Sequence, residues 1–326
     1  MIIETGKEED EIIEEEVEGG LVERTEEHEY LGFWVNESGD CELQIQKKDK
    51  KLKGEVSTIR SLACVWNVGS MYFCIRLFLF EACIVPSMLY LIEAWGANEK
   101  EVEQLEKMQH HILCNLLEVP KTTPYYGLLH ETGIWSVKWK LAYRKIMLYH
   151  NIMGSDGDRK VKAVVEQQKG EDGSFYEDTQ SVMRMLELTG VDEMKKDELK
   201  KTIKDKVRLK MEEEIRTMVE KSRKLRFLKN VTFRQAPYFQ CVGGEDAKLI
   251  LKLRLNMVDV YGNFKGDITK RRLCLHCKEC MDSTEHMVQC SKVSGAKEQY
   301  VDILSEQDSE EWIPLLKVVK ENLNGR

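Results

Sequence analysis

Residues 271–290, RRLCLHCKECMDSTEHMVQC, decide how the C-terminal part of the chain folds. They place Cys274, Cys277, His286 and Cys290 in the spacing Cys-x2-Cys-x8-His-x3-Cys. Three thiolates and one imidazole satisfy the tetrahedral preference of Zn²⁺, and the two halves of the motif fit a tight turn and one face of a helical turn. Because four protein ligands leave no position open for water, the spacing predicts a structural zinc site that holds a small module in shape.

Other uses of the cysteines fit the sequence less well. The chain has ten cysteines, and the six outside this motif and Cys280's neighbourhood lie scattered in apolar or mixed runs, as free thiols do in intracellular proteins. They are Cys41, Cys64, Cys74, Cys83, Cys114 and Cys241. Cys280 creates a Cys-x2-Cys-x2-Cys run, but the Cys-Pro that completes a ferredoxin iron–sulfur pattern is missing. If one of the four ligands is wrong, Cys280 and His276 are the alternatives.

Length and composition favour a helix-rich protein of two or three small domains, since 326 residues include 42% hydrophobic and 33% charged residues. The first 20 residues are acidic and have neither the basic region nor the cleavage site of a signal peptide. Residues 71–95 are apolar, but Arg76, Glu81 and Pro86 are each costly in lipid, which favours a buried helix over a membrane span. We therefore expect an intracellular protein, cytoplasmic or nuclear, that is not secreted and does not contact a membrane.

Charge is distributed unevenly along the chain, whose formal net charge is −8. Residues 1–29 contain 13 Asp/Glu and 2 Lys/Arg, which leaves 44 acidic and 47 basic residues for the remainder. Residues 195–230 carry 14 Lys/Arg against 7 Asp/Glu. The sequence thus predicts a disordered acidic tail, residues 1–28, attached to a mildly basic body.

Hydrophobic periodicity predicts a mainly α-helical chain. Residues 29–35 (EYLGFWV), followed by NESGD, predict a hairpin or a strand–turn–helix unit. Asn98 and Glu101 have the spacing of a capping box at the start of a helix that Pro120 ends. Further helices are expected at about 47–66, 77–92, 134–153, 192–230, 245–258 and 312–323. The turn-rich stretches 154–157 and 168–174 suggest a domain boundary.

Several motifs, taken in order, resemble the C-terminal region of reverse transcriptases from non-LTR (LINE-type) retrotransposons. Tyr30-Leu31-Gly32 resembles the strand that follows the polymerase palm, and residues 75–95 (IRLFLFEACIVPSMLYLIEAW) resemble the apolar helix of the family. Residues 122–152 resemble its helical signature segment, with Glu131-Thr132-Gly133 at the helix entry. Residues 249–264 (LILKLRLNMVDVYGNF), followed by CLHC and TEHMVQC, are similar to its terminal zinc-knuckle block.

The resemblance covers roughly residues 29–292 and implies a fold and a function. It implies a helical thumb and connector, a short N-terminal β element and a C-terminal CCHC zinc knuckle. The expected domains are 1–28 (acidic tail), 29–155 (thumb-like region), 156–230 (charged connector) and 231–326 (zinc-knuckle module). The parent activity is RNA-directed DNA polymerisation, which needs paired palm aspartates to hold two metal ions.

The sequence departs from this family at its active site. No Phe/Tyr-Ala-Asp-Asp run occurs in the chain, and we find no other catalytic set. Only an acidic stretch of about 28 residues precedes the Tyr30-Leu31-Gly32 strand, so we expect a truncated open reading frame that binds nucleic acid without polymerase activity of its own.

Two basic clusters are the candidate nucleic-acid contacts. The first, where the resemblance places the thumb, comprises Lys47, Lys48, Lys50, Lys51 and Lys53, and the second comprises Arg223, Lys224 and Arg226. Such residues neutralise phosphates without reading sequence. The first cluster could instead be a solvated helix face, in which Asp49 and Glu55 reduce the positive charge. The second could instead offset the negative end of a helix dipole. Trp135, Trp139 and Tyr143 are expected to belong to the core rather than to a base-stacking surface.

The expected partner is RNA or DNA, or both, bound mostly through phosphate contacts, with no membrane and no small-molecule substrate. The second hypothesis is a zinc-stabilised protein-interaction module that has no role in nucleic-acid binding.

Overall fold

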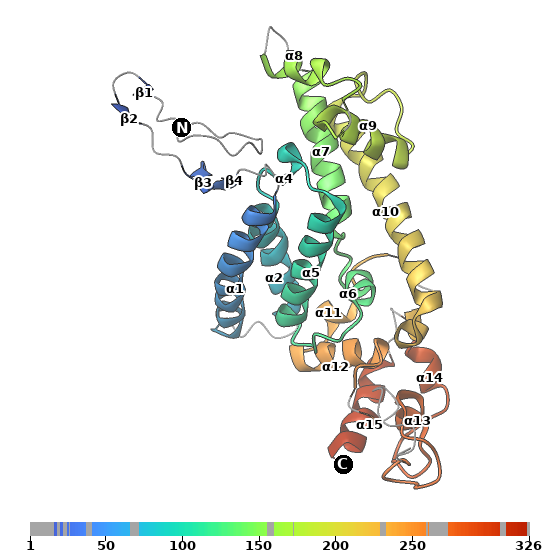
Figure 1. The fold of residues 1–326 in the computed structure, drawn as a ribbon. Helices are drawn as coiled ribbons and strands as arrows, with labels where there is room; N and C mark the ends of the chain where they lie inside the picture. The colour runs from blue at the N-terminus through green and yellow to red at the C-terminus, as the bar shows by residue number, and fades with distance from the viewer. Residues whose placement is uncertain are drawn as a thin grey trace. The chain divides into compact units, whose positions relative to one another are not determined.

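The computed structural model describes most of the chain (Figure 1). The described residues are 16–17, 20–21, 25, 27–36, 41–65, 72–154, 160–171, 173–228, 233–258, 260, 273–306 and 311–324. Helices dominate them, and the strands form two antiparallel pairs, β1 (Glu16–Val17) with β2 (Gly20–Leu21) and β3 (Glu27–Tyr30) with β4 (Phe33–Asn36). The prediction of a mainly α-helical chain with a short N-terminal β element is confirmed. Most of the predicted acidic tail lies outside the described residues.

The chain forms two compact units, and neither is continuous in sequence. Unit 1 comprises Met1–Glu55, Glu81–Met108 and Val137–Lys204, and unit 2 comprises Val56–Phe80, Gln109–Ser136 and Asp205–Arg326. Helices α1 (Glu42–Val65), α5 (Glu99–Leu116) and α10 (Lys196–Lys221) contribute residues to both units. The domain boundaries expected at residues 155 and 230 stay predictions.

The N-terminal β element of unit 1 is a hairpin. Tyr30 pairs with Phe33 across a two-residue turn in which Leu31 has φ 49° and Gly32 has φ 82°. Positive φ at both central residues is the geometry that matches the twist of paired strands. The turn therefore lies inside the EYLGFWV run, whereas NESGD was expected to supply the turn. Residues 37–40 are outside the described part, and α1 begins at Glu42, about five residues earlier than predicted.

Unit 1 is built around α7 (Val137–Met153), which packs against α4 (Ile92–Trp95), α8 (Lys160–Gln167) and α9 (Phe175–Met185). Trp139 on α7 is 2% exposed, as expected of a core residue, while Trp135 and Tyr143 are half-buried. The predicted capping box is confirmed, because the backbone N–H of Asn98 donates to Glu101 (2.7 Å) and that of Glu101 donates to the Asn98 side chain (3.0 Å). Glu101 also accepts the backbone N–H of Cys41 (2.6 Å) and so ties α5 to the start of α1.

The helix predicted around residues 77–92 is present, since helical residues run without a gap from Tyr72 to Met88, but it is not one regular helix and it ends before Ile92. The stretch consists of α2 (Tyr72–Leu79), a π-helical segment (Phe80–Ile84), α3 (Val85–Met88), a turn with Leu91 at φ 62°, and α4. Pro86 has no N–H to donate to the preceding turn, so one hydrogen bond of the regular ladder is lost there, and the π-helical segment lies directly before α3, which contains Pro86. Among the described residues, no helix combines the length and the apolar character that crossing a membrane requires.

Unit 2 contains shorter helices around one fully buried ion pair and one that is buried on the arginine side alone. They are α6 (Tyr125–Thr132), the 3₁₀ helix η3 (Arg223–Leu228), α11 (Tyr238–Cys241), α12 (Gly244–Arg254), α13 (Thr284–Gln289), α14 (Tyr300–Ile303) and α15 (Trp312–Asn324). Arg76 of α2, fully buried, contacts Glu118 (2.8 Å) and donates to the carbonyl of Leu116 (2.7 Å). Arg254 of α12 pairs with Glu131 of α6 (2.9 Å), and both side chains are fully buried. These contacts give the charged side chains partners inside the core.

Residues 131–133 end a helix rather than begin one, which corrects the expectation from the resemblance. Glu131 and Thr132 form the last turn of α6, and Gly133 follows as its C-cap with φ 66°. A β-carbon at Gly133 would lie 2.5 Å from the backbone nitrogen of Gln235. Only glycine combines this left-handed conformation with such a close approach of two backbone segments.

Candidate metal centre

The Cys-x2-Cys half of the predicted site lies in a closed loop. Leu273 and Met281 pair across an antiparallel bridge, and the N–H of Cys274 donates to the carbonyl of Cys280 (2.7 Å). The N–H of Lys278 donates to the carbonyl of Cys274 (2.9 Å), with Lys278 itself at φ 60°. These bonds curl the chain tightly enough to bring two cysteines three residues apart to the same side.

The His-x3-Cys half lies on α13, as the spacing predicted. Ser283 caps the helix, its hydroxyl accepting the backbone N–H of His286 (3.2 Å). Cys290 is the C-cap, four residues after His286. Residues separated by four positions lie on the same helical face, so both ligands point toward the loop.

The structure brings the four predicted ligands together. Their ligand atoms all lie within 4.8 Å of one another. The sulfurs of Cys274 and Cys290 are 3.8 Å apart, and the Cys277 sulfur lies 3.3 Å from Nε2 of His286. A tetrahedral ion with metal–sulfur bonds of about 2.3 Å separates its sulfurs by about 3.8 Å. The cluster can therefore hold a metal ion.

The surroundings of the cluster favour the thiolate form of Cys277 and disfavour that of Cys290. Backbone N–H groups of Cys280 and Glu279 that donate to the sulfur lower the pKa of Cys277 to about 6. Burial raises the pKa of Cys290, and the Cys274 thiol nearby raises it further. A metal binds the deprotonated form of cysteine, so an ion in this cluster must displace the proton of Cys290. The burial of Cys290 opposes this step because it disfavours the thiolate.

The two alternative ligands are placed differently from the four. The His276 ring contacts the backbone carbonyl of Asn322 on α15 (3.2 Å), and the Asn322 amide donates to the carbonyl of Met287 (3.1 Å). His276 therefore helps to hold the loop against α15 and α13. Cys280 is exposed and belongs to none of the ligand pairs within the cluster.

Most members of the first basic cluster already have partners in unit 1. Lys47 pairs with Glu27 of β3 (2.9 Å) and lies 4.0 Å above the Trp34 ring. Two further ion pairs run along α1, Lys51–Glu55 (3.9 Å) and Lys53–Asp49 (2.5 Å). Lys48 lies over the Tyr90 ring (5.5 Å), and burial, together with the neighbouring Lys51, lowers its pKa. Lys50 is exposed.

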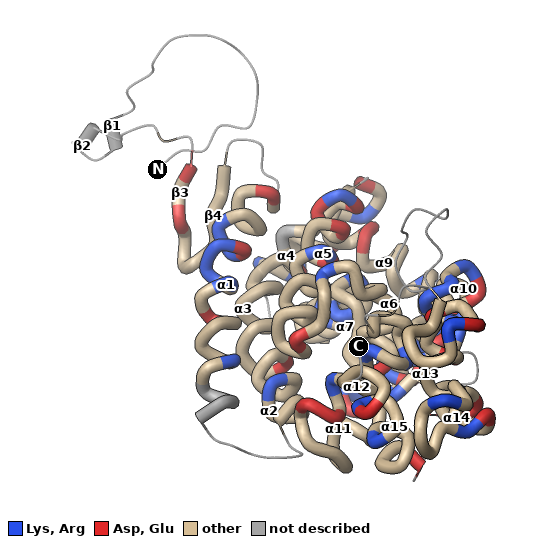
Figure 2. The backbone as a smooth tube through the Cα atoms, turned by 90° about the horizontal axis from the view of Figure 1, so that it is seen from below, with Lys and Arg blue, Asp and Glu red and all other residues tan. Residues whose placement is uncertain are grey.

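The second basic cluster is divided between structural contacts and solvent. Arg226 donates to Glu285 of α13 (2.6 Å) and to the Asn256 side chain (2.9 Å). Lys224 donates to the carbonyl of Thr122 (3.2 Å), while Arg223 is exposed. Figure 2 shows Lys/Arg and Asp/Glu mixed along α10, just before this cluster. The structure thus places both clusters on surfaces of mixed charge.

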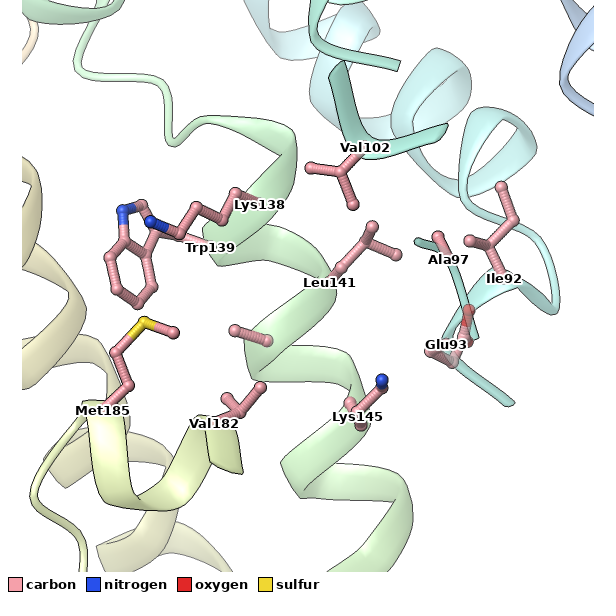
Figure 3. Close-up of a pocket in the computed structure, with 11 residues that line it drawn as sticks. Ile92, Glu93, Ala97, Val102, Lys138, Trp139, Leu141, Lys145, Val182 and Met185 are labelled. Carbon is pink, nitrogen blue, oxygen red and sulfur yellow. The ribbon is translucent and has the colours of Figure 1, made fainter. Parts of the chain in front are cut away.

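A small pocket in unit 1 lies between α4, α5, α7 and α9 (Figure 3). Its volume is about 130 Å³, and its lining is mostly apolar, with Trp139, Leu141, Val182 and Met185 among the residues drawn. The ammonium of Lys145, which lines one side, pairs with Asp178 (3.1 Å). The pocket includes none of the residues predicted to bind metal or nucleic acid. Its size matches that of a single apolar side chain or ring.

Comparison of the chain with known protein families, curated proteins and solved structures finds no match. The resemblance to non-LTR reverse transcriptases therefore rests on the sequence motifs, their order and the Cys/His spacing.

Proposed function

We propose that the chain is a nucleic-acid-binding protein, related to the C-terminal region of non-LTR reverse transcriptases, in which one structural Zn²⁺ holds the C-terminal module. The observation that carries this proposal is the convergence of Cys274, Cys277, His286 and Cys290. The chain is proposed to lack polymerase activity of its own, because its sequence has no paired palm aspartates to hold two metal ions.

The donor set supports zinc over other ions. Mg²⁺ and Ca²⁺ prefer oxygen ligands, whereas three thiolates and an imidazole at tetrahedral separations suit Zn²⁺. With all four positions filled by protein, the ion would stabilise the loop and α13 without activating water. Elemental analysis of purified protein is expected to find one zinc per chain. Cys274→Ser and Cys290→Ser should lose it, and Cys280→Ser should keep it. A zinc content that depends on Cys280 but not on His286 would contradict this ligand set.

Two observations support phosphate binding: some cations of the two clusters are exposed, and the ion pairs of other lysines in the first cluster are weak. Lys50 and Arg223 are exposed, and Lys51 and Lys53 pair with carboxylates of their own helix at exposed positions. Such surface pairs contribute little to stability, so a phosphate can replace the carboxylate at small cost. Contacts of this kind position a nucleic acid without reading its sequence.

Salt dependence of binding tests this part of the proposal. The triple variant Lys50→Glu, Lys51→Glu, Lys53→Glu should weaken binding to RNA and to DNA about equally across sequences. It should also flatten the slope of log K against log salt by roughly 0.7–0.9 per lost phosphate contact. Lys107→Glu is the matched control, since Lys107 is an exposed, ion-paired lysine of α5 (2.8 Å from Glu103) outside both clusters. Equal dissociation constants for wild type and triple variant at matched ionic strength would contradict the proposal.

A second candidate function is a protein-interaction module. The mixed charge of both clusters favours it, because surfaces on which Lys47 and Arg226 already pair with Glu27 and Glu285 offer little excess positive charge. The same titration separates the two functions, since docking of a protein partner need not show a steep salt slope.

A further inference from the structure

Four aromatic rings form a row on unit 2. His110 and His111 lie in the part of α5 that belongs to this unit, and Tyr125 and Tyr126 begin α6. From His111 through His110 and Tyr125 to Tyr126, successive ring centroids are 6.0, 5.7 and 5.5 Å apart. His111 is exposed, and the other three residues are half-buried. This aromatic row therefore offers ring surface to solvent across two helices.

Hydrogen bonds hold the two middle rings of the row in place. The His110 ring contacts the carbonyl of Thr123 through Nε2 (2.8 Å), and the Tyr125 hydroxyl donates to the side chain of Gln109 (2.6 Å). Gln109 is fully buried and donates in turn to the carbonyl of Trp135 (2.9 Å). Because these rings are already fixed, a planar group that stacks on the row orders few side chains and loses little entropy.

The 3₁₀ helix η3 lies against the loop that joins α5 to α6. Lys224 of η3 donates to the carbonyl of Thr122 in this loop (3.2 Å), one residue before the carbonyl that the aromatic row contacts. A β-carbon at Gly127 of α6 would lie 2.7 Å from Cδ2 of Leu225 of η3, so the two elements are in close contact. The second basic cluster and the aromatic row are thus neighbours, although 102 positions separate Thr122 from Lys224 in the sequence.

Cations flank the aromatic row. Lys121 in the connecting loop and Arg223 on η3 are both exposed, and η3 itself contains no acidic residue. The one carboxylate in the sequence between the two pairs of rings is that of Glu118, which is paired with Arg76 (2.8 Å) and Lys248 (3.2 Å). Exposed cations beside exposed rings complement a polyanion that also carries aromatic groups.

We propose that the aromatic row and its flanking cations bind single-stranded nucleic acid, with unpaired bases stacked on the rings and phosphates held by Lys121, Arg223 and Lys224. This inference rests on the proposed nucleic-acid function, and it names the form of the strand that the chain takes. Every base has a π-face, so stacking of this kind tolerates any sequence. In a duplex the bases stack on one another, and exposing one to the row costs unpairing and unstacking energy.

Fluorescence anisotropy tests the inference with labelled RNA and DNA oligonucleotides, each offered to the full chain as a single strand and as a duplex. Wild type should bind the single strands about tenfold more tightly than the duplexes at matched ionic strength. His111→Ala should weaken single-strand binding about fivefold to tenfold and leave duplex binding unchanged. The variant should fold, because His111 is exposed and alanine is the better helix former.

The cations should respond differently from the rings. Lys121→Glu should weaken single-strand binding and flatten the slope of log K against log salt by about 0.7, whereas His111→Ala should leave this slope unchanged. The matched controls are exposed residues of the same unit, Phe78→Ala on α2 and Lys317→Glu on α15, and both should bind as wild type does.

A fluorescent base analogue, 2-aminopurine, reports stacking directly. Its emission in a single strand should be quenched when wild type binds and less quenched with His111→Ala. Equal affinity of wild type for single strands and duplexes, or an equal loss of both in His111→Ala, would overturn the inference. A wild-type chain that binds neither form would instead refute the proposed nucleic-acid function.

Discussion

Replacing Arg254 with methionine removes the centre of the buried polar network of unit 2. Arg254 donates from Nε and Nη2 to the two oxygens of Glu131 (2.9 and 3.0 Å). Its Nη1 donates to the carbonyls of Leu304 (2.8 Å) and Glu306 (2.6 Å). One side chain thus joins α6, α12 and the segment that follows α14.

The expected loss follows from what the substitution leaves behind. Removing one partner of a buried ion pair costs about 3–5 kcal/mol, because the other charge stays buried without compensation. Methionine has a similar length, so a cavity adds little to the loss. We expect Arg254→Met to lower the free energy of unfolding of unit 2 by about 4 kcal/mol. Tyr238→Phe removes only the hydroxyl that donates to Glu131 (2.7 Å), which should cost about 1.5–3 kcal/mol.

A double-mutant cycle isolates the ion pair from other effects. Chains with Arg254→Met, with Glu131→Leu and with both changes are unfolded in guanidinium chloride with zinc present, and far-UV circular dichroism is recorded. Hydrogen exchange of the α12 peptide assigns the transition to unit 2. The double variant should be more stable than the sum of the two single losses predicts, by roughly 3 kcal/mol, because neither charge is then left unpaired. A change below about 1 kcal/mol in Arg254→Met, with α12 still protected, would refute the reasoning.

The same pair gives the stability of unit 2 a pH dependence. Burial alone would raise the pKa of Glu131, but Arg254 and His130 lower it from 4.5 to about 2. A carboxyl whose folded pKa lies below its unfolded value stabilises the fold above the unfolded pKa and loses this contribution as the pH falls toward the folded pKa. We expect the free energy of unfolding of wild type to fall between about pH 4.5 and 2, and to fall less steeply in the double variant.

Three further predictions concern other parts of the chain. Gly133→Ala should destabilise unit 2 by about 2 kcal/mol or more in thermal unfolding, because its β-carbon would lie 2.5 Å from the Gln235 nitrogen; an unchanged melting temperature would contradict this. Glu101→Ala should cost unit 1 about 2 kcal/mol, since it removes the capping box and the acceptor of the Cys41 N–H; hydrogen exchange at the start of α5 should then accelerate. Deleting residues 1–24, which spares the β3–β4 hairpin, should tighten RNA binding if the acidic segment competes with phosphates for lysines, and an equal dissociation constant would argue against competition.

Local patterns account for the features that the sequence predicted correctly. The capping box depends on residues three apart, and the metal cluster depends on two spacings, each within a single turn. Both are fixed by short-range backbone geometry, so residue order suffices to recognise them. The hairpin was recognised for the same reason, although its turn was placed several residues too late.

Features set by tertiary partners could not be predicted in this way. Lys252 and Arg254 both lie in the apolar run LILKLRL, yet only Arg254 is fully buried. The fold brings Arg254 to Glu131, a partner that lies 123 residues earlier in the chain. The neighbouring sequence does not indicate which of Lys252 and Arg254 is buried. Likewise, the apolar character of residues 71–95 signals burial but not the π-helical segment before Pro86. Burial there is dictated by composition, whereas the break depends on how the chain packs on both sides.

The basic residues of the two clusters differ in how easily a phosphate could reach them, because some of them already contact carboxylates. Arg226 donates to Glu285 of α13, one residue before the predicted ligand His286, and the side chains of both are about one quarter exposed. A phosphate that binds Arg226 must displace this carboxylate and disturb the first turn of the helix that carries two ligands. Lys50 and Arg223 are exposed, so a phosphate can approach either one from solvent. The contacts of Arg226 thus favour a structural role, in which it joins η3 to α13. Lys50 and Arg223 are the better candidates for the proposed phosphate contacts.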